Sequence, residues 1–281
     1  ADHPANTQDL PWVAGGCSTE RSFSEGSQPM GIFRPVHLVV TSDVRIEPFG
    51  VHIWNDDKVT EKSAQLKMES TVKNYSAVVR NITVVNQLFD KAGKKVAELK
   101  RVEKILPGKT IALKQQTEEL KNVQLWSIEN PYLYTMKTSI KEGNKTIDEL
   151  NTPYGIRWIS WPIGENPADS KRFLLNGKPV FINGIAEYEH LVGQSHAFSN
   201  EQIHSRVMQI KSAGFNSFRD AHQPHNLLYQ EYWDKLGILS WTQMAAHIWY
   251  DTPEFRTNFK NLLIDWVKET RNSHSVVLWG L

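Results

Sequence analysis

The stretch from Gly214 to Asn226, GFNSFRDAHQPHN, ends in side chains that could bind a ligand or take part in catalysis. Alternating apolar and polar residues predict a short strand, and a dense group of titratable side chains follows it. That group comprises Arg219, Asp220, His222 and His225. Side chains of these types can exchange protons, hold a metal ion or bind hydroxyl groups.

Two neighbouring predicted strands also end in polar side chains. In a parallel barrel the active face lies at the carboxyl ends of the strands, so these side chains are expected to converge on one rim. Carboxylates, arginine and histidines around an opening lined with aromatic side chains suit the hydrolysis of glycosides. In that reaction polar groups bind the sugar hydroxyls while carboxylates cleave the glycosidic bond. Any single histidine could instead make an ordinary structural hydrogen bond. The residues at these two strand ends are Glu187, Tyr188, Glu189, His190, Gln243 and His247.

Other kinds of site receive little support. No pair of the histidines has the i, i+4 spacing on a helix that two zinc ligands favour. No G-x-S-x-G motif marks a nucleophilic serine. The G-x-G-x-x-G turn of a dinucleotide site is missing after the first strand, where the glycines are Gly184 and Gly193. We therefore expect no metal ion and no cofactor.

The segment 172–281 alternates strand and helix patterns. Ser199 and Gln202 form a capping box before its first helix, and Pro253 occupies the first position of its third helix. Strands separated by helices at this spacing form a parallel sheet, either closed as a barrel or open and doubly wound. Four strands correspond to half of an eight-stranded barrel. Strands are predicted at 180–186, 216–221, 238–244 and 275–281, and helices at 200–214, 226–237 and 252–272.

Residues 44–157 have a pattern of β-strands throughout. In LKMESTVKN, for example, Leu66, Met68 and Val72 share one face of the predicted strand. Turn signals such as Pro107-Gly108 separate the runs. Many short antiparallel strands over about 110 residues indicate an immunoglobulin-like β-sandwich.

The remaining segments are poor in regular patterns. Residues 1–43 are rich in Gly, Ser and Pro and become strand-like only at GIFRPVHLVVT, where Ile32, Val36, Leu38 and Val40 fall mostly on alternate positions. Residues 158–171 form a polar linker that contains proline. The expected order is therefore a domain remnant at 1–43, the sandwich at 44–157, the linker at 158–171, and four β/α units of a barrel at 172–281.

Composition limits the class of partner. The chain has 281 residues, 40% of them hydrophobic, and a formal net charge of +1, so no overall charge would hold a nucleic acid or an anionic membrane. No apolar run approaches the ~18 residues of a membrane span. The single cysteine, Cys17, excludes an intrachain disulfide. We expect neither nucleic acid nor a membrane as a partner.

The motifs resemble those of family 2 glycoside hydrolases, which include β-galactosidases, β-glucuronidases and β-mannosidases. GIFRPVHL is similar to the closing strand of that family's sugar-binding jelly roll, LWSIENPYLY and YGIRWI to its immunoglobulin-like domain, and FLLNGKPVFINGI to the opening of its barrel. The resemblance covers nearly the whole chain. The family order G-x-N-x-x-R-x-x-H-x-P is matched at Gly214, Asn216, Arg219, His222 and Pro224.

The resemblance implies roles for individual residues. Arg219 would organise the carboxylate region, and His222 together with His190 would bind sugar hydroxyls. The family's general acid/base is the Glu of an Asn-Glu pair directly after the fourth strand, and its nucleophile lies on a later strand, so both are expected after Leu281. The 281 residues alone are therefore expected to be inactive. The predicted substrate-binding residues are Glu189, His190, Asn216, Arg219, Asp220 and His222.

The chain departs from the family pattern at two strand ends. Where many members read G-V-N-R-H-E-H after the first strand, this chain reads GIAEYEH, from Gly184 to His190. Where many end the third strand in an acidic residue, this chain has Gln243, which removes one expected charge. Both changes weaken the transfer of a particular substrate from the family.

Three functional hypotheses remain open at this point. The first is a retaining exo-β-glycosidase, with β-galactosidase favoured, acting on an oligosaccharide or other glycoside. The second is a carbohydrate-binding or scaffold protein with a degenerate barrel. The third makes Glu189 and Asp220 a catalytic carboxylate pair, which would require a separation of about 5 Å. A periplasmic or secreted location is favoured over the cytoplasm, and a homo-oligomer is left open.

Overall fold

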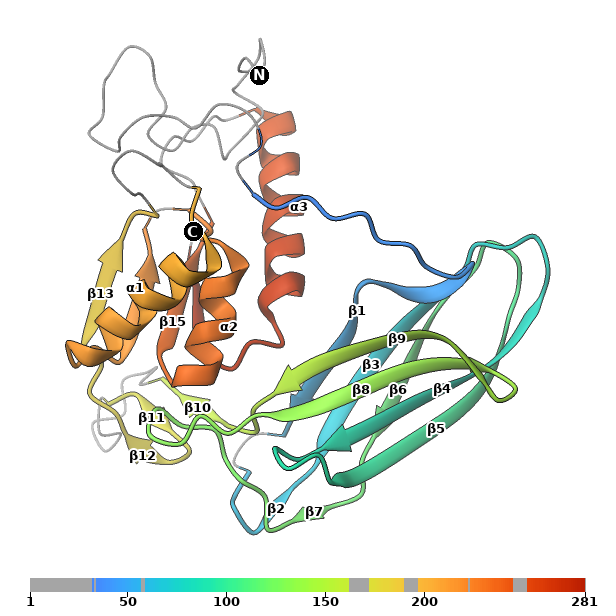
Figure 1. The fold of residues 1–281 in the computed structure, drawn as a ribbon, viewed down its shortest axis with the longest axis horizontal. Coiled ribbons are helices and arrows are strands. Elements are labelled where there is room, and N and C mark those ends of the chain that lie inside the picture. Colours follow the sequence, from blue (N-terminus) through green and yellow to red (C-terminus); the bar gives the residue numbers. More distant parts are fainter. Residues whose placement is uncertain are drawn as a thin grey trace. The chain divides into compact units, whose positions relative to one another are not determined.

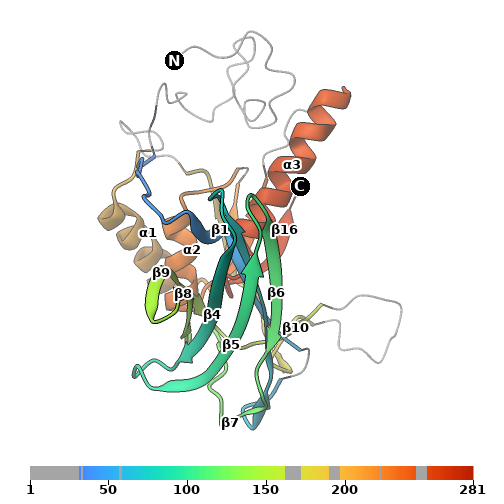
Figure 2. The same ribbon diagram turned by 90° about the vertical axis from the view of Figure 1, so that its right-hand side faces the viewer.

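The computed structural model of the chain describes residue 32 and residues 34–56, 59–161, 172–189, 197–221, 223–244 and 252–280. These residues form two compact units (Figure 1; Figure 2). The sandwich unit spans Leu38–Phe181 together with Asn272–His274. The barrel unit combines the described residues up to His37 with Ile182–Arg271 and residues from Ser275 onward. A short segment that precedes the sandwich in sequence therefore belongs to the barrel unit.

The sandwich unit contains two antiparallel sheets, one of three strands in the order β1-β3-β6 and one of four strands in the order β5-β4-β8-β9. A two-stranded ladder, β2-β7, accompanies them. The predicted β-sandwich is confirmed. The strands are β1 (Val44–Asn55), β2 (Ser63–Ala64), β3 (Leu66–Asn74), β4 (Arg80–Phe89), β5 (Lys95–Ile105), β6 (Thr110–Gln116), β7 (Leu120–Lys121), β8 (Tyr134–Glu142) and β9 (Lys145–Tyr154).

Alternation along the strands places the core of the sandwich. In β3 every second residue is buried, as the period of two predicts. Leu66, Met68 and Val72 are at most 1% exposed, and they share one cluster with Ile82 and Leu88 of β4. Burying each such side chain contributes roughly 1.5–3 kcal/mol.

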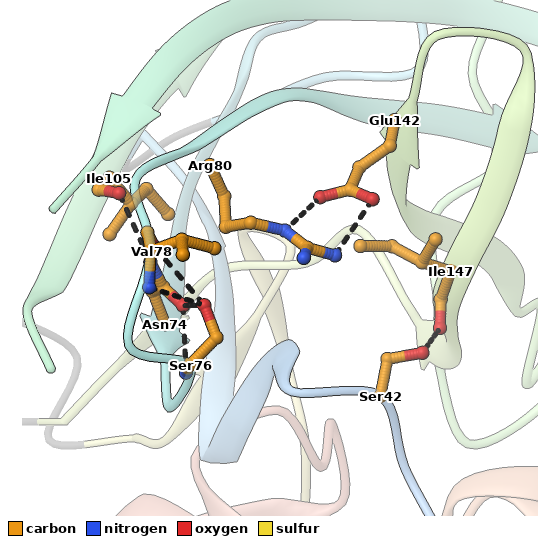
Figure 3. A network of polar contacts seen from close by, with 8 residues as sticks. All are labelled: Ser42, Asn74, Ser76, Val78, Arg80, Ile105, Glu142 and Ile147. Atoms are coloured by element: carbon orange, nitrogen blue, oxygen red, sulfur yellow. Dashed lines mark hydrogen bonds and ion pairs between the residues drawn. The ribbon is translucent and has the colours of Figure 1, made fainter. Parts of the chain in front are cut away.

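Asn74 organises the connection between β3 and β4 (Figure 3). Its side-chain Nδ2 donates to the carbonyl oxygens of Val78, at 2.8 Å, and Ile105, at 3.1 Å. Its Oδ1 accepts a hydrogen bond from the backbone N of Ser76 at 2.9 Å. Asn74 is fully buried, so its amide cannot bond to water, and these protein hydrogen bonds take the place of the bonds to water.

Two further contacts in Figure 3 join elements that are distant in sequence. Arg80, at the start of β4, forms a bidentate pair with Glu142, at the end of β8, with N–O distances of 2.5 and 2.9 Å. Ser42 Oγ donates to the carbonyl oxygen of Ile147 in β9 at 2.8 Å. The first contact joins the ends of the two central strands of the four-stranded sheet, and the second ties the chain just before β1 to the edge strand β9.

A short three-stranded sheet follows the sandwich, formed by β10 (Ile159–Ser160), β11 (Leu174–Leu175) and β12 (Lys178–Pro179). Asn176 and Gly177 both have left-handed φ angles, of 52° and 78°, as a two-residue hairpin turn requires. This hairpin belongs to the sandwich unit, which extends to Phe181. The linker expected at 158–171 stays a prediction, because residues 162–171 lie outside the described residues.

The barrel unit contains a parallel sheet in the order β13-β14-β15-β16. Three helices connect these strands, so the predicted start of a barrel is confirmed. In the part of the chain that is described, no helix is long and apolar enough to span a membrane. The elements are β13 (Gly184–Glu187), α1 (Asn200–Ser212), β14 (Ser217–Asp220), α2 (Leu227–Leu236), β15 (Leu239–Gln243), α3 (Pro253–Thr270) and β16 (Val276–Gly280).

The helix ends lie where the sequence predicts. Ser199 and Gln202 form the expected capping box of α1, and Thr252 caps α3 with Pro253 in its first turn. Gly237, with φ of 70°, ends α2 in the left-handed conformation that glycine adopts without strain. These local signals set the lengths of the helices and thereby fix where each following strand begins.

One sequence prediction differs from the structure. The stretch GIFRPVHLVVT was expected to be strand-like, but its described residues, Ile32 and Arg34–Thr41, form no strand. Val36, Leu38 and Val40 are 76%, 93% and 87% exposed. A strand requires a neighbouring backbone, and the described residues provide none for this segment. The remainder of the predicted jelly-roll remnant, residues 1–31 and 33, lies outside the described residues.

Gly155 gives a direct test of packing in the sandwich. A Cβ at this position would lie 2.8–2.9 Å from three side-chain atoms of Trp126, which is fully buried. We expect Gly155→Ala to lower the free energy of unfolding of the sandwich by about 1–3 kcal/mol, because the indole cannot move without displacing the core. Thermal melting and hydrogen exchange of the full-length protein would measure this. Asn151→Ala, at an exposed position of β9, is the control, and equal stability of the two variants would contradict the packing argument.

Candidate functional site

The strand ends of the barrel unit bring the predicted polar residues together. In the parallel register, Glu187 of β13 pairs with Asp220 of β14, and Arg219 pairs with Trp241 of β15. The carboxyl ends of three consecutive strands therefore lie at one edge of the sheet. This is the edge at which barrel enzymes build their sites.

Glu189, two residues after β13, is completely buried. Arg34 forms a bidentate ion pair with it, in which Nη1 donates to Oε1 at 2.8 Å and Nη2 donates to Oε2. The backbone N of Asn226 donates a third hydrogen bond, to Oε1, at 3.0 Å. A buried carboxylate is tolerated only when it is paired and hydrogen-bonded, and all three bonds serve that purpose here.

The Glu189 contacts connect three parts of the unit. Arg34 precedes the sandwich in sequence, Glu189 follows β13, and Asn226 is the N-cap residue of α2. As the cap, Asn226 accepts a hydrogen bond at its Oδ1 from the backbone N of Leu228. Glu189 thus fixes the loop after β13 to the start of α2. The same carboxylate would have to lose Arg34 before it could act as a nucleophile, which argues against the hypothesis of a Glu189–Asp220 catalytic pair.

Asp220, the last residue of β14, is also completely buried. Thr242 Oγ1 donates to its Oδ2 at 2.7 Å, and Trp266 Nε1 donates to Thr242 Oγ1 at 3.1 Å. His225 Nδ1 lies 3.1 Å from Asp220 Oδ1, an ion-pair distance, although the two atoms are not aligned for a hydrogen bond. The structure therefore pairs Asp220 with His225.

Several charges act on the imidazole of His225, which is buried among aromatic rings. Burial alone lowers its pKa, but the carboxylates of Asp220, Glu189 and Glu187 outweigh burial and raise the pKa above the ordinary value. The ring stacks edge-on against Phe218 and Tyr229 at centroid distances of 5.5 Å. We take the ion pair with Asp220 as the dominant interaction of this group, because the distance is short and both side chains are 1% exposed.

Arg219 lies on the opposite face of β14 from Phe218 and Asp220. Those two neighbours are buried, whereas Arg219 is partly exposed, as alternation along a strand requires. Its Nε donates to Gln243 Oε1 at 3.2 Å, and its Cζ lies 4.7 Å from the ring centroid of Trp241. The planar guanidinium is therefore held by an amide and an aromatic face, so its position at the strand end is well defined.

Gly280 makes room for the indole that supports Arg219. A Cβ at this position would overlap Nε1 of Trp241 and lie 3.1 Å from its Cε2. Gly280 pairs in register with Gln243, the other partner of Arg219. The glycine at the end of β16 thus leaves space for the Trp241 ring, and β15 supplies the two side chains that contact Arg219.

The structure separates the other predicted site residues. Asn216 precedes β14, at the amino end of the strand, where its Oδ1 accepts a hydrogen bond from the backbone N of Asn183 at 2.8 Å. That position gives no support to its predicted contact with substrate. His190, His222 and His247 lie outside the described residues, and their predicted roles are not tested.

Sequence reasoning missed two contributors to the strand-end region. Arg34 is the counter-ion of Glu189, and Arg206 of α1 pairs with Glu187 at 2.9 Å. A single charged residue within the apolar run GIFRPVHL was the available signal for Arg34. Among the described residues, no group of three or more His, Cys, Asp or Glu side chains is arranged to hold a metal ion.

Comparison with protein families agrees with this arrangement. The model of "Glycosyl hydrolases family 2" matches residues 44–157, and the model of "Glycosyl hydrolases family 2, TIM barrel domain" matches residues 168–281. The chain belongs to glycoside hydrolase family 2. The family 2 sandwich and the start of the family 2 barrel are thus assigned to the two units of the structure.

Individual members of family 2 are similar over most of the chain. A β-galactosidase of Bacteroides ovatus, BoGH2A, is 29% identical over 271 residues, which are 94% of this chain and 31% of that protein. A β-glucuronidase of Bacteroides fragilis is 25% identical over 89% of this chain and 37% of its own length. The crystal structure of a Bacteroides uniformis β-glucuronidase has the same fold, with a TM-score of 0.79 and 24% identity over 85% of this chain and 29% of that one. The chain spans about a third of the length of these relatives.

Arg34→Ala tests the buried pair at the strand ends of this family 2 barrel. The variant would leave Glu189 with only the Asn226 amide, which we expect to cost about 2–3 kcal/mol of local stability, below the usual figure for a fully buried pair because Arg34 is 33% exposed. In the full-length protein, amide exchange of segments 184–189 and 223–236 should become about tenfold faster or more. Arg101→Ala, on the exposed β5 strand, is the control. Unchanged exchange in Arg34→Ala would show that the pair does not hold this region.

His225 should make stability depend on pH. Because its pKa is raised in the folded state, the stabilisation is fully present below the unfolded-state value of about 6.5 and is lost as pH rises through the higher folded-state pKa. His225→Gln removes the charge and keeps a polar side chain. The difference in melting temperature between wild type and this variant should therefore be larger at about pH 6 than at about pH 9. A difference that is constant, or that grows toward alkaline pH, would contradict the pairing of His225 with Asp220.

Proposed function

We propose that this chain is part of a retaining exo-β-glycosidase that removes terminal β-linked sugars, with a β-galactoside as the favoured substrate. The observation that carries the proposal is the strand-end arrangement of a family 2 barrel. There Arg219 lies on the face of β14 opposite Phe218 and Asp220 and is held by Gln243 and Trp241. A fixed guanidinium at this edge can place the carboxylates that act on the glycosidic bond.

Ion pairs support a positioning role for the described carboxylates. Glu187 pairs with Arg206, Glu189 with Arg34, and Asp220 with His225. A retaining glycosidase needs one carboxylate to attack the anomeric carbon and a second carboxylic acid to protonate the leaving oxygen. Because each described strand-end carboxylate already has a cationic partner, we place the catalytic pair in the part of the protein that follows Leu281.

The choice of a galactoside over a uronide is also part of the proposal. A glucuronidase must bind the carboxylate of its sugar, which arginine does best in bidentate geometry. Arg34 and Arg206 are already paired with glutamates, and Arg219, held by Gln243 and Trp241, is assigned here to placing the catalytic carboxylates. BoGH2A, a β-galactosidase, is similar over 94% of the chain. Both observations favour a neutral sugar.

Arg219→Ala tests the proposed function. In the full-length protein we expect turnover of 4-nitrophenyl β-galactoside to fall about a hundredfold or more, because a preorganised charge is lost at the reacting end of the barrel. The thermal melt should change little, since Arg219 is a partly exposed residue of a strand end. Arg101→Ala again serves as the control, because it removes an arginine from the surface of the sandwich.

A panel of chromogenic substrates completes the test. The wild-type protein should hydrolyse the β-galactoside faster than the β-glucuronide and the β-mannoside. Faster turnover of the glucuronide would show that the substrate is a β-glucuronide instead of a β-galactoside, while the type of reaction stays as proposed. Near wild-type turnover in Arg219→Ala would remove Arg219 from the site.

A further inference from the structure

A cavity of about 980 Å³ lies in the sandwich unit and has no role in the proposed reaction. It is lined by the turn after β1, the segment between β7 and β8, and the β11–β12 hairpin. All of its lining residues belong to the sandwich unit, and none is among the strand-end residues of the barrel. A concave surface of this size can hold a ligand of several rings.

Trp158 forms an aromatic wall of the cavity and is held firmly. Its backbone N donates to Asn176 Oδ1 at 3.1 Å, and its carbonyl oxygen accepts from the backbone N of Asn176 at 2.9 Å. Asn176 is itself fixed, because its Nδ2 donates to the carbonyl oxygen of Trp126 at 2.9 Å. The chain on both sides of the indole is therefore tied to the hairpin and to the core.

The hairpin turn also packs against the indole. A Cβ on Gly177 would lie 3.3 Å from Cζ2 of Trp158, so the glycine backbone lies close to this ring. The ring remains partly exposed, and its Nε1 forms no hydrogen bond with any described residue. A rigid, partly exposed indole with an available donor is suited to stack on a sugar ring and bind one of its hydroxyls.

The polar residues around the cavity carry balanced charges. Glu61 and Glu129 contribute two negative charges, and Lys62 and Lys178 contribute two positive charges. A phosphate or a uronic acid would gain no net attraction from this rim, and neither would a cation. The balance favours a ligand without charge.

Amide groups complete the hydrogen-bonding capacity of the cavity. Gln124 and Asn130 both line it, and both are exposed. Their side chains form no hydrogen bond with any described residue, so each amide can donate to and accept from a ligand hydroxyl. Glycan hydroxyls, which also donate and accept, match this combination of amides and an indole.

We propose that this cavity binds a neutral oligosaccharide, with Trp158 stacked on one pyranose ring and the amides of Gln124 and Asn130 bonded to its hydroxyls. This inference rests on the proposed function in one respect, the choice of a carbohydrate as the class of ligand. A site of this kind would hold a polymeric or branched glycan on the protein while its terminal sugars are removed. It would raise the effective concentration of the substrate without adding a catalytic group.

The experiment uses the full-length protein and two neutral probes without a β-galactosyl end, cellotetraose and xylotetraose, with trigalacturonate as a charged comparison. Isothermal titration calorimetry measures the affinity of each probe, and hydrolysis of 4-nitrophenyl β-galactoside is measured separately. In Trp158→Ala we expect about tenfold weaker binding of at least one neutral tetraose, which corresponds to about 1.4 kcal/mol. The kcat/KM for the small aryl substrate should stay unchanged, because none of the residues that line the cavity is among the strand-end residues of the barrel.

Further variants keep the test decisive. Trp158→Phe preserves packing and should weaken tetraose binding to a smaller extent, and Gln124→Ala should weaken it without affecting the core. Tyr75→Ala, which removes an aromatic ring exposed to 46% elsewhere on the sandwich, is the matched control and should bind like the wild type. Wild-type affinity in all three cavity variants would overturn the proposal, as would tighter binding of trigalacturonate than of either tetraose. Absence of aryl galactoside hydrolysis in the wild type would count against the proposed function alone, because tetraose binding is scored on its own.

Discussion

The buried charge of Glu189 is the constraint on which the strand-end region depends. A carboxylate with no exposed surface is stable only with a fixed counter-ion, and Arg34 and the Asn226 amide together satisfy both of its oxygens. Through these bonds the loop after β13 and the start of α2 are held in one arrangement. The other strand-end carboxylates follow the same rule, since Glu187 and Asp220 each have a cationic partner.

Arg219, at the end of β14, is held in a different way from these carboxylates. Arg219 contacts an amide and an indole, which hold its plane without neutralising its charge. On β14, one face carries Phe218 and the Asp220 pair, and the opposite face carries the partly exposed arginine. Period-two alternation thus divides one strand between a supporting side and a side that can meet a ligand.

Local signals in the sequence predicted most of the elements. Caps such as Ser199 and Gly237 depend on residues within one turn of the helix, and alternation in β3 depends on adjacent residues, so both could be inferred directly. The partners of buried charges could not, because Arg34 lies 155 residues from Glu189. The strand expected near Val36 was wrong for a related reason, since strand formation depends on a neighbouring backbone that a sequence pattern does not reveal. Likewise, the family motif indicated Asn216 but not that it lies at the amino end of β14.

The separation between Arg34 and Glu189 has a consequence for how the molecule folds. All strands of the sandwich are synthesised between the two residues, so the guanidinium leaves the ribosome long before the carboxylate that it neutralises. Closing a loop of 155 residues costs entropy that is recovered only after both ends are ordered. We therefore expect the ion pair to form late in folding, once both ends of this loop are ordered. Interactions that form this late chiefly set the rate of unfolding and contribute little to the rate of folding, so we expect Arg34 to slow unfolding more than it speeds folding.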